Sequence, residues 1–214
     1  MIPQHCQAII FDMDGVLWHS ADAHEESFRQ VLNDEGLTMP AYSKLAGRRT
    51  DEVMRELLEL QKGGVDLDQL RRMTFAKQAL ANKLLMQSAP VAAMCFDVLQ
   101  KLAQSFRIVL ASSGSKQNVQ LFLDTCGAKN LFEFALSGND VQSAKPSPDI
   151  YLLALNMLKL PANLCLVVED SFSGIEAARK AGIPCVAITG THSHKELEQC
   201  PVQSVIDKLE ELCQ

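Results

Sequence analysis

Acidic and hydroxyl side chains stand directly after three short apolar runs of this sequence. These side chains belong to Asp12, Asp14, Ser112, Ser113, Glu169 and Asp170. Apolar runs without alternation are typical of parallel strands covered on both faces, and the carboxyl ends of such strands share one edge of a sheet. A single Asp after a strand is as often a turn or capping residue. Three such endings together predict one ligand site.

Three carboxylates at one edge of a sheet require a counter-charge. Asp12, Glu169 and Asp170 have ordinary pKa values near about 4, so all three would be ionised at neutral pH. Like charges about 4 Å apart repel by roughly 4 kcal/mol at an effective dielectric constant of about 20. A cation relieves this repulsion, and a ligand set made only of oxygens favours Mg²⁺ over zinc. The acidic cluster therefore predicts a magnesium site.

A serine-rich turn and a lysine add the features of an anion site. The turn Ser112-Ser113-Gly114-Ser115 opens a predicted helix, whose first N–H groups can bind an anion. Lys145, in the segment 144–149, adds a positive charge before another predicted helix. A divalent metal, an anion cradle and a lysine together predict a phosphate site. The carboxylate nearest the phosphorus can then act as a nucleophile.

The elements that must position these residues alternate between strand and helix. Strands are predicted at 8–11, 108–111, 164–168 and 185–188, with a weaker candidate at 134–136. Amphipathic stretches at 115–127 and 173–182 predict helices between the strands. This order predicts an α/β fold, with a Rossmann-like, doubly wound parallel sheet as its core.

One long segment interrupts this alternation. Residues 18–90 read as helical, with helices expected at 22–36, after a capping Thr50, and at 66–87. A loop of this length is improbable inside a compact domain. We therefore predict a small helical domain at 18–90, inserted into an α/β core made of residues 1–17 and 91–214.

Composition excludes several classes of protein. The chain has 214 residues and a net charge of −6, which argues against a protein that wraps nucleic acid, because affinity for the phosphate backbone comes from excess Lys and Arg. No apolar run approaches the roughly 18 residues of a membrane span, and the start lacks the pattern of a secretory signal. The seven cysteines form no CxxC pair, so buried, reduced thiols and a cytoplasmic location are expected.

Four motifs in this order resemble the haloacid dehalogenase (HAD) superfamily of phosphohydrolases. They are Phe11-Asp12-Met13-Asp14-Gly15-Val16-Leu17, Ala111-Ser112-Ser113, Lys145-Pro146, and Val168-Glu169-Asp170-Ser171 followed by Gly174-Ile175-Glu176-Ala177-Ala178. The subgroup that the chain resembles is that of the β-phosphoglucomutase-like enzymes, which carry a helical cap inserted after the first motif. The inserted segment at 18–90 corresponds to that cap.

The resemblance implies a role for each motif residue. Asp12 would attack phosphorus and bind the metal. Asp14 would protonate the leaving oxygen, and its carbonyl would bind Mg²⁺; as an acid it would need a raised pKa, which neighbouring negative charges would favour. Ser112 and Lys145 would hold the transferring phosphoryl group. Catalytic residues would thus be Asp12, Asp14, Ser112 and Lys145, and metal ligands Asp12, Asp14, Asp170 and Glu169, the last either directly or behind the ligands.

Residues of the cap and of the serine turn are expected to contact the substrate. The substrate-binding set comprises Ser113, Gly114, His24, Arg48 and Arg49. His24 occupies the position where β-phosphoglucomutase-like proteins often have a histidine, although a packed or solvated role is equally open. At least one of the two arginines is expected to contact a substrate anion, because adjacent cations at a helix start oppose the helix dipole. Lys77 lies where the mutases have a lysine, but the general behaviour of lysine favours a surface position.

The leading interpretation is a Mg²⁺-dependent phosphatase that acts on a small phosphorylated metabolite, in particular a sugar phosphate, through an aspartyl-phosphate. Two alternatives stay open. One is a phosphomutase of the β-phosphoglucomutase type, and the other is a non-catalytic phosphate-binding regulatory module. The expected protein is a monomer or weak dimer, without a nucleic-acid or membrane partner.

Overall fold

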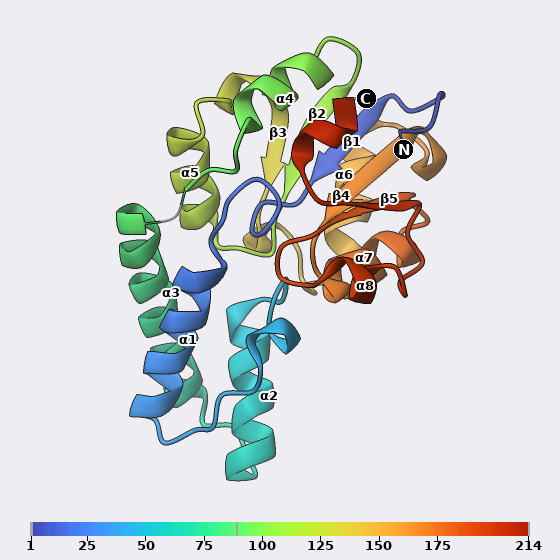
Figure 1. Ribbon diagram of the computed structural model, residues 1–214. Helices are drawn as coiled ribbons and strands as arrows, with labels where there is room; N and C mark the ends of the chain where they lie inside the picture. Colours follow the sequence, from blue (N-terminus) through green and yellow to red (C-terminus); the bar gives the residue numbers. More distant parts are fainter. Residues whose placement is uncertain (1, 89, 214) are drawn as a thin grey trace.

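The computed structural model describes residues 2–88 and 90–213, so positions 1, 89 and 214 of the predicted ranges lie outside the described residues. Its centre is a parallel sheet in the order β3-β2-β1-β4-β5-β6 (Figure 1). The strands are β1 Ala8–Phe11, β2 Arg107–Ala111, β3 Phe132–Leu136, β4 Cys165–Glu169, β5 Cys185–Ile188 and β6 Ser204–Ile206. All the predicted strands are present, and the predicted doubly wound α/β fold is confirmed.

The short edge strand β6 was not predicted. It has only three residues, and two of them are half-buried, so no continuous apolar run marks it in the sequence. It pairs with β5 in parallel, through Val186 with Ser204 and Ile188 with Ile206. β6 forms because it pairs with β5, although its own sequence has no strand pattern. The formation of an edge strand depends mainly on its structural context.

Helices cover both faces of the sheet because alternate side chains of each strand point to opposite faces. Ile9 and Phe11 of β1 pack into one apolar cluster, with residues of α4 Cys95–Leu102 and α5 Lys116–Thr125. Ala8 and Ile10 pack into the other, with residues of α6 Asp149–Leu158, α7 Phe172–Lys180 and α8 His194–Leu197. Both strand faces are therefore buried, which explains the unbroken apolar runs.

The segment between β1 and α4 forms three α-helices with an apolar cluster of their own, and a 3-10 helix at Tyr42–Lys44 lies between the first two. The α-helices are α1 Ala21–Asp34, α2 Thr50–Lys62 and α3 Leu67–Ser88. Phe28, Leu32, Met54 and Leu58 are among the buried residues that hold them together. Figure 1 shows the three helices grouped beyond one end of the sheet. The residue boundaries of 18–90 stay a prediction, although a bridge between Trp18 and Val91 brings the two ends of the segment together.

One detail of this segment differs from the expectation. Thr50 is the first residue inside α2, and the capping position before it is Arg49, whose backbone is extended. The prediction that Thr50 itself caps the helix is wrong. Asp51 and Glu52 in the first turn supply the negative charge that the helix start favours.

The cysteines are all free, and five of the seven are buried, in line with the expectation of reduced thiols. Within residues 2–88 and 90–213, no helix is both long and apolar enough to cross a membrane.

Candidate active site

Three carboxylates lie together at the carboxyl end of the sheet. Asp12 follows β1, Glu169 ends β4, and Asp170 follows it. All three are buried, and one oxygen from each lies within 4.8 Å of the others. The sheet register brings them together, because Phe11 pairs with Val168 across β1 and β4 and the Asp12 N–H donates to the Val168 carbonyl at 3.0 Å. Residues separated by more than 150 positions thus reach one point.

The ammonium of Lys145 lies between two of these carboxylates. Its Nζ is 2.6 Å from Asp12 Oδ1 and 2.7 Å from Glu169 Oε1, and it also donates to the Ala111 carbonyl at 3.1 Å. Burial alone would lower the pKa of Lys145, but the two carboxylates raise it above its ordinary value. Lys145 therefore stays cationic and offsets part of the negative charge of the cluster.

Glu169 orients this arrangement and has little capacity left for a metal. Its Oε1 accepts from Lys145 and from the Tyr151 hydroxyl at 2.9 Å. Its Oε2 accepts from the Ser171 hydroxyl at 3.0 Å and from the backbone N–H groups of Asp170 and Ser171. With both oxygens engaged, Glu169 fits the role of a residue behind the metal ligands better than that of a ligand.

Tyr151 was missed by sequence reasoning. It is one of the buried apolar residues of α6, and its position in the sequence resembles any other core position of a helix. Only the fold shows that its hydroxyl reaches Glu169.

Asp12 and Asp170 have the chemistry of a divalent-cation site. Burial raises the pKa of Asp12 well above its ordinary value; Glu169, Asp14 and Asp170 add to that rise and Lys145 opposes it. Burial, followed by the charge of Glu169, raises the pKa of Asp170 to about 7. These carboxyls would ionise fully only beside further positive charge. An oxygen-only set of buried acids fits Mg²⁺.

Asp14 belongs to a second chain of polar contacts. Its Oδ1 accepts from the Ser20 hydroxyl at 2.6 Å and lies 3.1 Å from His24 Nε2, and His24 Nδ1 lies 3.0 Å from Lys77 Nζ. Burial would raise the pKa of Asp14, but His24, Ser20 and Lys77 together lower it. The expectation of a raised pKa for Asp14 is therefore not met in this arrangement. The reason is that the contacts with His24, Ser20 and Lys77 outweigh the effect of burial.

Lys77 is buried, so the expectation of a surface position is wrong. Its side chain lies 4.2 Å from the centre of the Phe28 ring and reaches His24. Burial lowers the pKa of Lys77 to about 8, although the charge of Asp14 opposes this. Burial and the charge of Lys77 also lower the pKa of His24. The prediction relied on the usual exposure of lysine. The contacts of Lys77 with Phe28 and His24 form only when α1 and α3 pack together, so the sequence does not show them.

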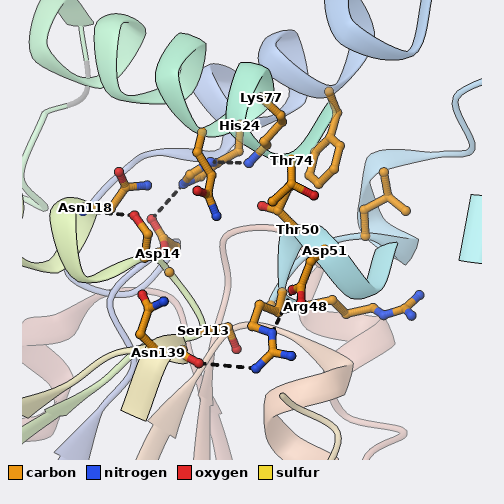
Figure 2. Close-up of a pocket in the computed structure, with 18 of the residues that line it drawn as sticks. Asp14, His24, Arg48, Thr50, Asp51, Thr74, Lys77, Ser113, Asn118 and Asn139 are labelled. Carbon is orange, nitrogen blue, oxygen red and sulfur yellow. Dashed lines mark hydrogen bonds and ion pairs between the residues drawn. The ribbon is translucent and has the colours of Figure 1, made fainter. Parts of the chain in front are cut away.

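The serine turn lies beside these two groups. The Ser112 hydroxyl accepts from the Gly114 N–H at 2.9 Å and lies 3.5 Å from Asp14 Oδ2. Ser113 and Gly114 line a cavity of about 450 Å³ whose floor includes Asp12 and Asp14. Helices α1 and α3 contribute His24 and Lys77 to its opposite side (Figure 2). The structure thus places residues of the core and of the helical segment around one space.

Both predicted arginines line this cavity, and both already have partners. Arg48 Nη2 lies 2.5 Å from Glu56 Oε2. Arg49 Nε lies 2.7 Å from Asp51 Oδ1, and its Nη1 donates to carbonyl groups of the core loop at Gly138, Val141 and Gln142, at 3.2–3.3 Å. A contact between either arginine and a substrate anion stays a prediction.

The sequence model of a family described as haloacid dehalogenase-like hydrolase matches residues 9–188, a span that holds all four motifs. The chain belongs to this family. The predicted resemblance to HAD enzymes is confirmed. A curated relative in sequence, fructose-1-phosphate phosphatase YqaB from Escherichia coli strain K12, is 28% identical over 183 residues, which cover 84% of this chain and 95% of the relative.

Solved structures of HAD proteins share the whole fold. CbbY from Rhodobacter sphaeroides in complex with phosphate is 26% identical, with a TM-score of 0.82 over 97% of this chain and 96% of that one. β-Phosphoglucomutase from Clostridium difficile is 22% identical, with a TM-score of 0.84 over 97% and 93%. The second likeness shows a shared fold and by itself assigns no activity.

Proposed function

We propose that this HAD-family protein is a Mg²⁺-dependent phosphatase that hydrolyses a sugar phosphate or a similar small monophosphate ester. The observation that carries the proposal is the position of Asp12. Its carboxylate lies at the floor of the cavity, with Lys145 bound to one oxygen and Asp170 close by. The similarity to fructose-1-phosphate phosphatase supports the substrate class.

Asp12 is the proposed nucleophile. Lys145 engages Oδ1, which leaves Oδ2 to form a bond with phosphorus while the bond from phosphorus to the ester oxygen breaks. Lys145 and the Ser112 hydroxyl hold the phosphoryl oxygens. When bound by Asp12, Asp170 and the Asp14 carbonyl, Mg²⁺ supplies charge that neutralises the carboxylates and the phosphoryl group.

Asp14 is the proposed acid and base. It donates a proton to the leaving ester oxygen and later takes one from the water that attacks the aspartyl-phosphate, which releases inorganic phosphate and restores Asp12. Its lowered pKa in the resting enzyme suits the second role. The negative charge of a bound phosphate ester would raise that pKa and so favour the first.

The test is release of inorganic phosphate from p-nitrophenyl phosphate with Mg²⁺ present. Asp12→Asn should lower kcat by at least about 10³-fold, since the nucleophile is removed, and chelation of Mg²⁺ should abolish turnover. Asp124→Asn, on the exposed side of α5, is the matched control and should keep wild-type turnover. Full activity of Asp12→Asn would contradict the proposal. So would conversion of β-glucose 1-phosphate in the presence of a bisphosphate without phosphate release, since that result is expected of a mutase.

A further inference from the structure

The loop at 189–193, between β5 and α8, packs closely against Asp170. A Cβ at Gly190 would lie 2.9 Å from the Gly15 carbonyl oxygen and 3.5 Å from Asp170 Oδ2. A Cβ at Gly15, whose φ is +81°, would overlap the same carboxylate oxygen. The two backbone segments can approach Asp170 this closely because both positions lack a side chain. The loop therefore lies against the proposed metal site.

Thr191, in this loop, holds the Asp170 carboxylate by two hydrogen bonds. Its hydroxyl donates to Asp170 Oδ2 at 2.6 Å, and its backbone N–H donates to the same oxygen at 3.3 Å. Within residues 2–88 and 90–213, no other group donates to this carboxylate, so Oδ1 is left to contact a cation. The backbone N–H of Asp170 donates to Glu169 Oε2 at 3.1 Å. Glu169 thus fixes the main chain of Asp170, and Thr191 fixes its side chain.

An aromatic stack holds the neighbour of Thr191 in place. The ring of His192 lies on that of Phe172, with 3.7 Å between the ring centres and 24° between the planes. His192 is 4% exposed, and its Nε2 is buried with no hydrogen-bond partner among the described residues. Because buried polar atoms normally have such a partner, the ring is held here by packing. Phe172 follows Asp170 by two positions, so the stack joins the loop to the segment that carries Asp170.

We infer that Thr191 is a positioning residue for the proposed magnesium site. By holding Asp170 Oδ2, it keeps the carboxylate in one orientation before the cation arrives, so that less conformational freedom is lost on binding. The stack of His192 on Phe172 keeps Thr191 within reach of Asp170. This inference rests on the Mg²⁺ dependence of the proposed function, and it adds a residue that sets the affinity for the cation.

The test measures cation binding to the metal-free protein directly, through the electron paramagnetic resonance signal of free Mn²⁺, with Mg²⁺ as competitor. Thr191→Val keeps the shape of the side chain but removes the hydroxyl. It should raise the Kd for Mn²⁺ by at least about tenfold, the usual effect of losing a group that hydrogen-bonds to a metal ligand. Thr191→Ser keeps the hydroxyl and should restore most of the affinity. Wild-type affinity in Thr191→Val would overturn the inference.

Thr125→Val, at the exposed end of α5, is the matched control and should bind Mn²⁺ like the wild type. Thermal unfolding of the metal-free proteins separates positioning from folding, because a positioning role leaves the Tm of Thr191→Val close to that of Thr191→Ser. Equal losses of affinity in these two variants, with a lowered Tm in both, would show a purely structural role and overturn the inference.

Two variants of His192 test the stack. His192→Phe keeps an aromatic ring and needs no partner at the position of Nε2, so it should bind Mn²⁺ like the wild type. His192→Ala removes the ring and should bind Mn²⁺ more weakly. Equal affinities in the two variants would overturn the role of the stack.

Failure of the proposed function would be visible separately. If the wild type binds Mn²⁺ but releases no phosphate from p-nitrophenyl phosphate, the phosphatase proposal fails, and the Kd values of the Thr191 variants still decide the inference. If the wild type binds no Mn²⁺, with or without inorganic phosphate, the metal dependence fails and the inference fails with it. In an active enzyme, Thr191→Val should raise the Mg²⁺ concentration for half-maximal turnover by the same factor as the Kd, and saturating Mg²⁺ should restore most of kcat.

Discussion

Lys77 is a buried cation whose position is unfavourable for the stability of the fold. The residue is 4% exposed, and its ammonium contacts His24 rather than a carboxylate. Because burial lowers its pKa from 10.5 to about 8, the charged form is disfavoured in the folded state. Stability is often lost at functional sites in this way.

Lys77→Met should therefore stabilise the protein while reducing its activity. At pH 7 the lysine is charged in both states, so the variant should gain roughly 1–3 kcal/mol in free energy of unfolding. Between pH 8 and about 10.5 the folded wild type releases the proton that its unfolded chain retains, so the stability of the wild type rises with pH. The advantage of the variant should shrink across this window. Urea titrations at several pH values measure it.

Lys83→Met is the matched control, because Lys83 is exposed on the same helix. It should change the free energy of unfolding by less than about 0.5 kcal/mol at every pH. A Lys77→Met variant less stable than the wild type at pH 7, or an advantage that does not change up to pH 10.5, would show that the ammonium is not disfavoured as argued.

Among single residues, the sequence predicted which charged side chains lie together at the site better than it predicted their hydrogen-bond partners. Asp12, Lys145 and Asp170 were recognisable because each follows or precedes a predicted element within a known motif. Tyr151 carries no such mark, since it looks like an ordinary buried residue of a helix. The lowered pKa of Asp14 could not be predicted from the sequence either, because it depends on the packing of His24 and Lys77 around this residue.

The junction of β4 and α7 holds the site through close backbone packing. Glu169 ends the strand, Ser171 caps the helix, and Gly174 lies in the first turn, directly against the Glu169 carboxylate. A Cβ at position 174 would overlap that carboxylate. The position of the Glu169 side chain, which orients Lys145, thus requires a glycine at position 174.

Gly174→Ala should destabilise the fold by about 1–3 kcal/mol, the usual result of overpacking, and should reduce turnover because Glu169 must move. Gly64→Ala is the control, because a Cβ there meets nothing within 4 Å and its backbone is not left-handed. Thermal unfolding and phosphate release measure both effects. Equal stability and turnover in the two variants would mean that the junction has room for a methyl group.

Strands were easier to predict than the elements that depend on neighbours. β1, β4 and β5 are buried along their whole length, and their sequences are apolar except for Glu169 at the end of β4. β3 has exposed and half-buried positions, which explains why only part of it was recognisable. The start of α2 was misplaced by one residue, because Thr is a common capping residue but here Arg49 takes that position.

For the whole molecule, the segment at 46–52, which includes the start of α2, contacts the core. Arg49 donates to three carbonyl groups of the 138–142 loop, Glu52 Oε1 accepts from the Ala144 N–H at 3.0 Å, and the Ser173 hydroxyl donates to the Ala46 carbonyl. We expect the helical segment to open and close on the linkers at 16–20 and 90–94, because water must enter for hydrolysis and stay out during phosphoryl transfer. These contacts would hold the closed form.

Arg49→Ala should shift the equilibrium toward the open form. Hydrogen bonds from a charged donor contribute about 1.5–3 kcal/mol each, so losing those of Arg49 should speed amide exchange at Ala144 by at least about tenfold. Arg55→Ala, on the exposed face of the same helix, should leave exchange at Ala144 unchanged. Hydrogen-exchange mass spectrometry of the 138–149 region provides the measurement. If both variants exchange like the wild type, Arg49 does not hold α2 against the core, and closure must depend on the other contacts of this interface.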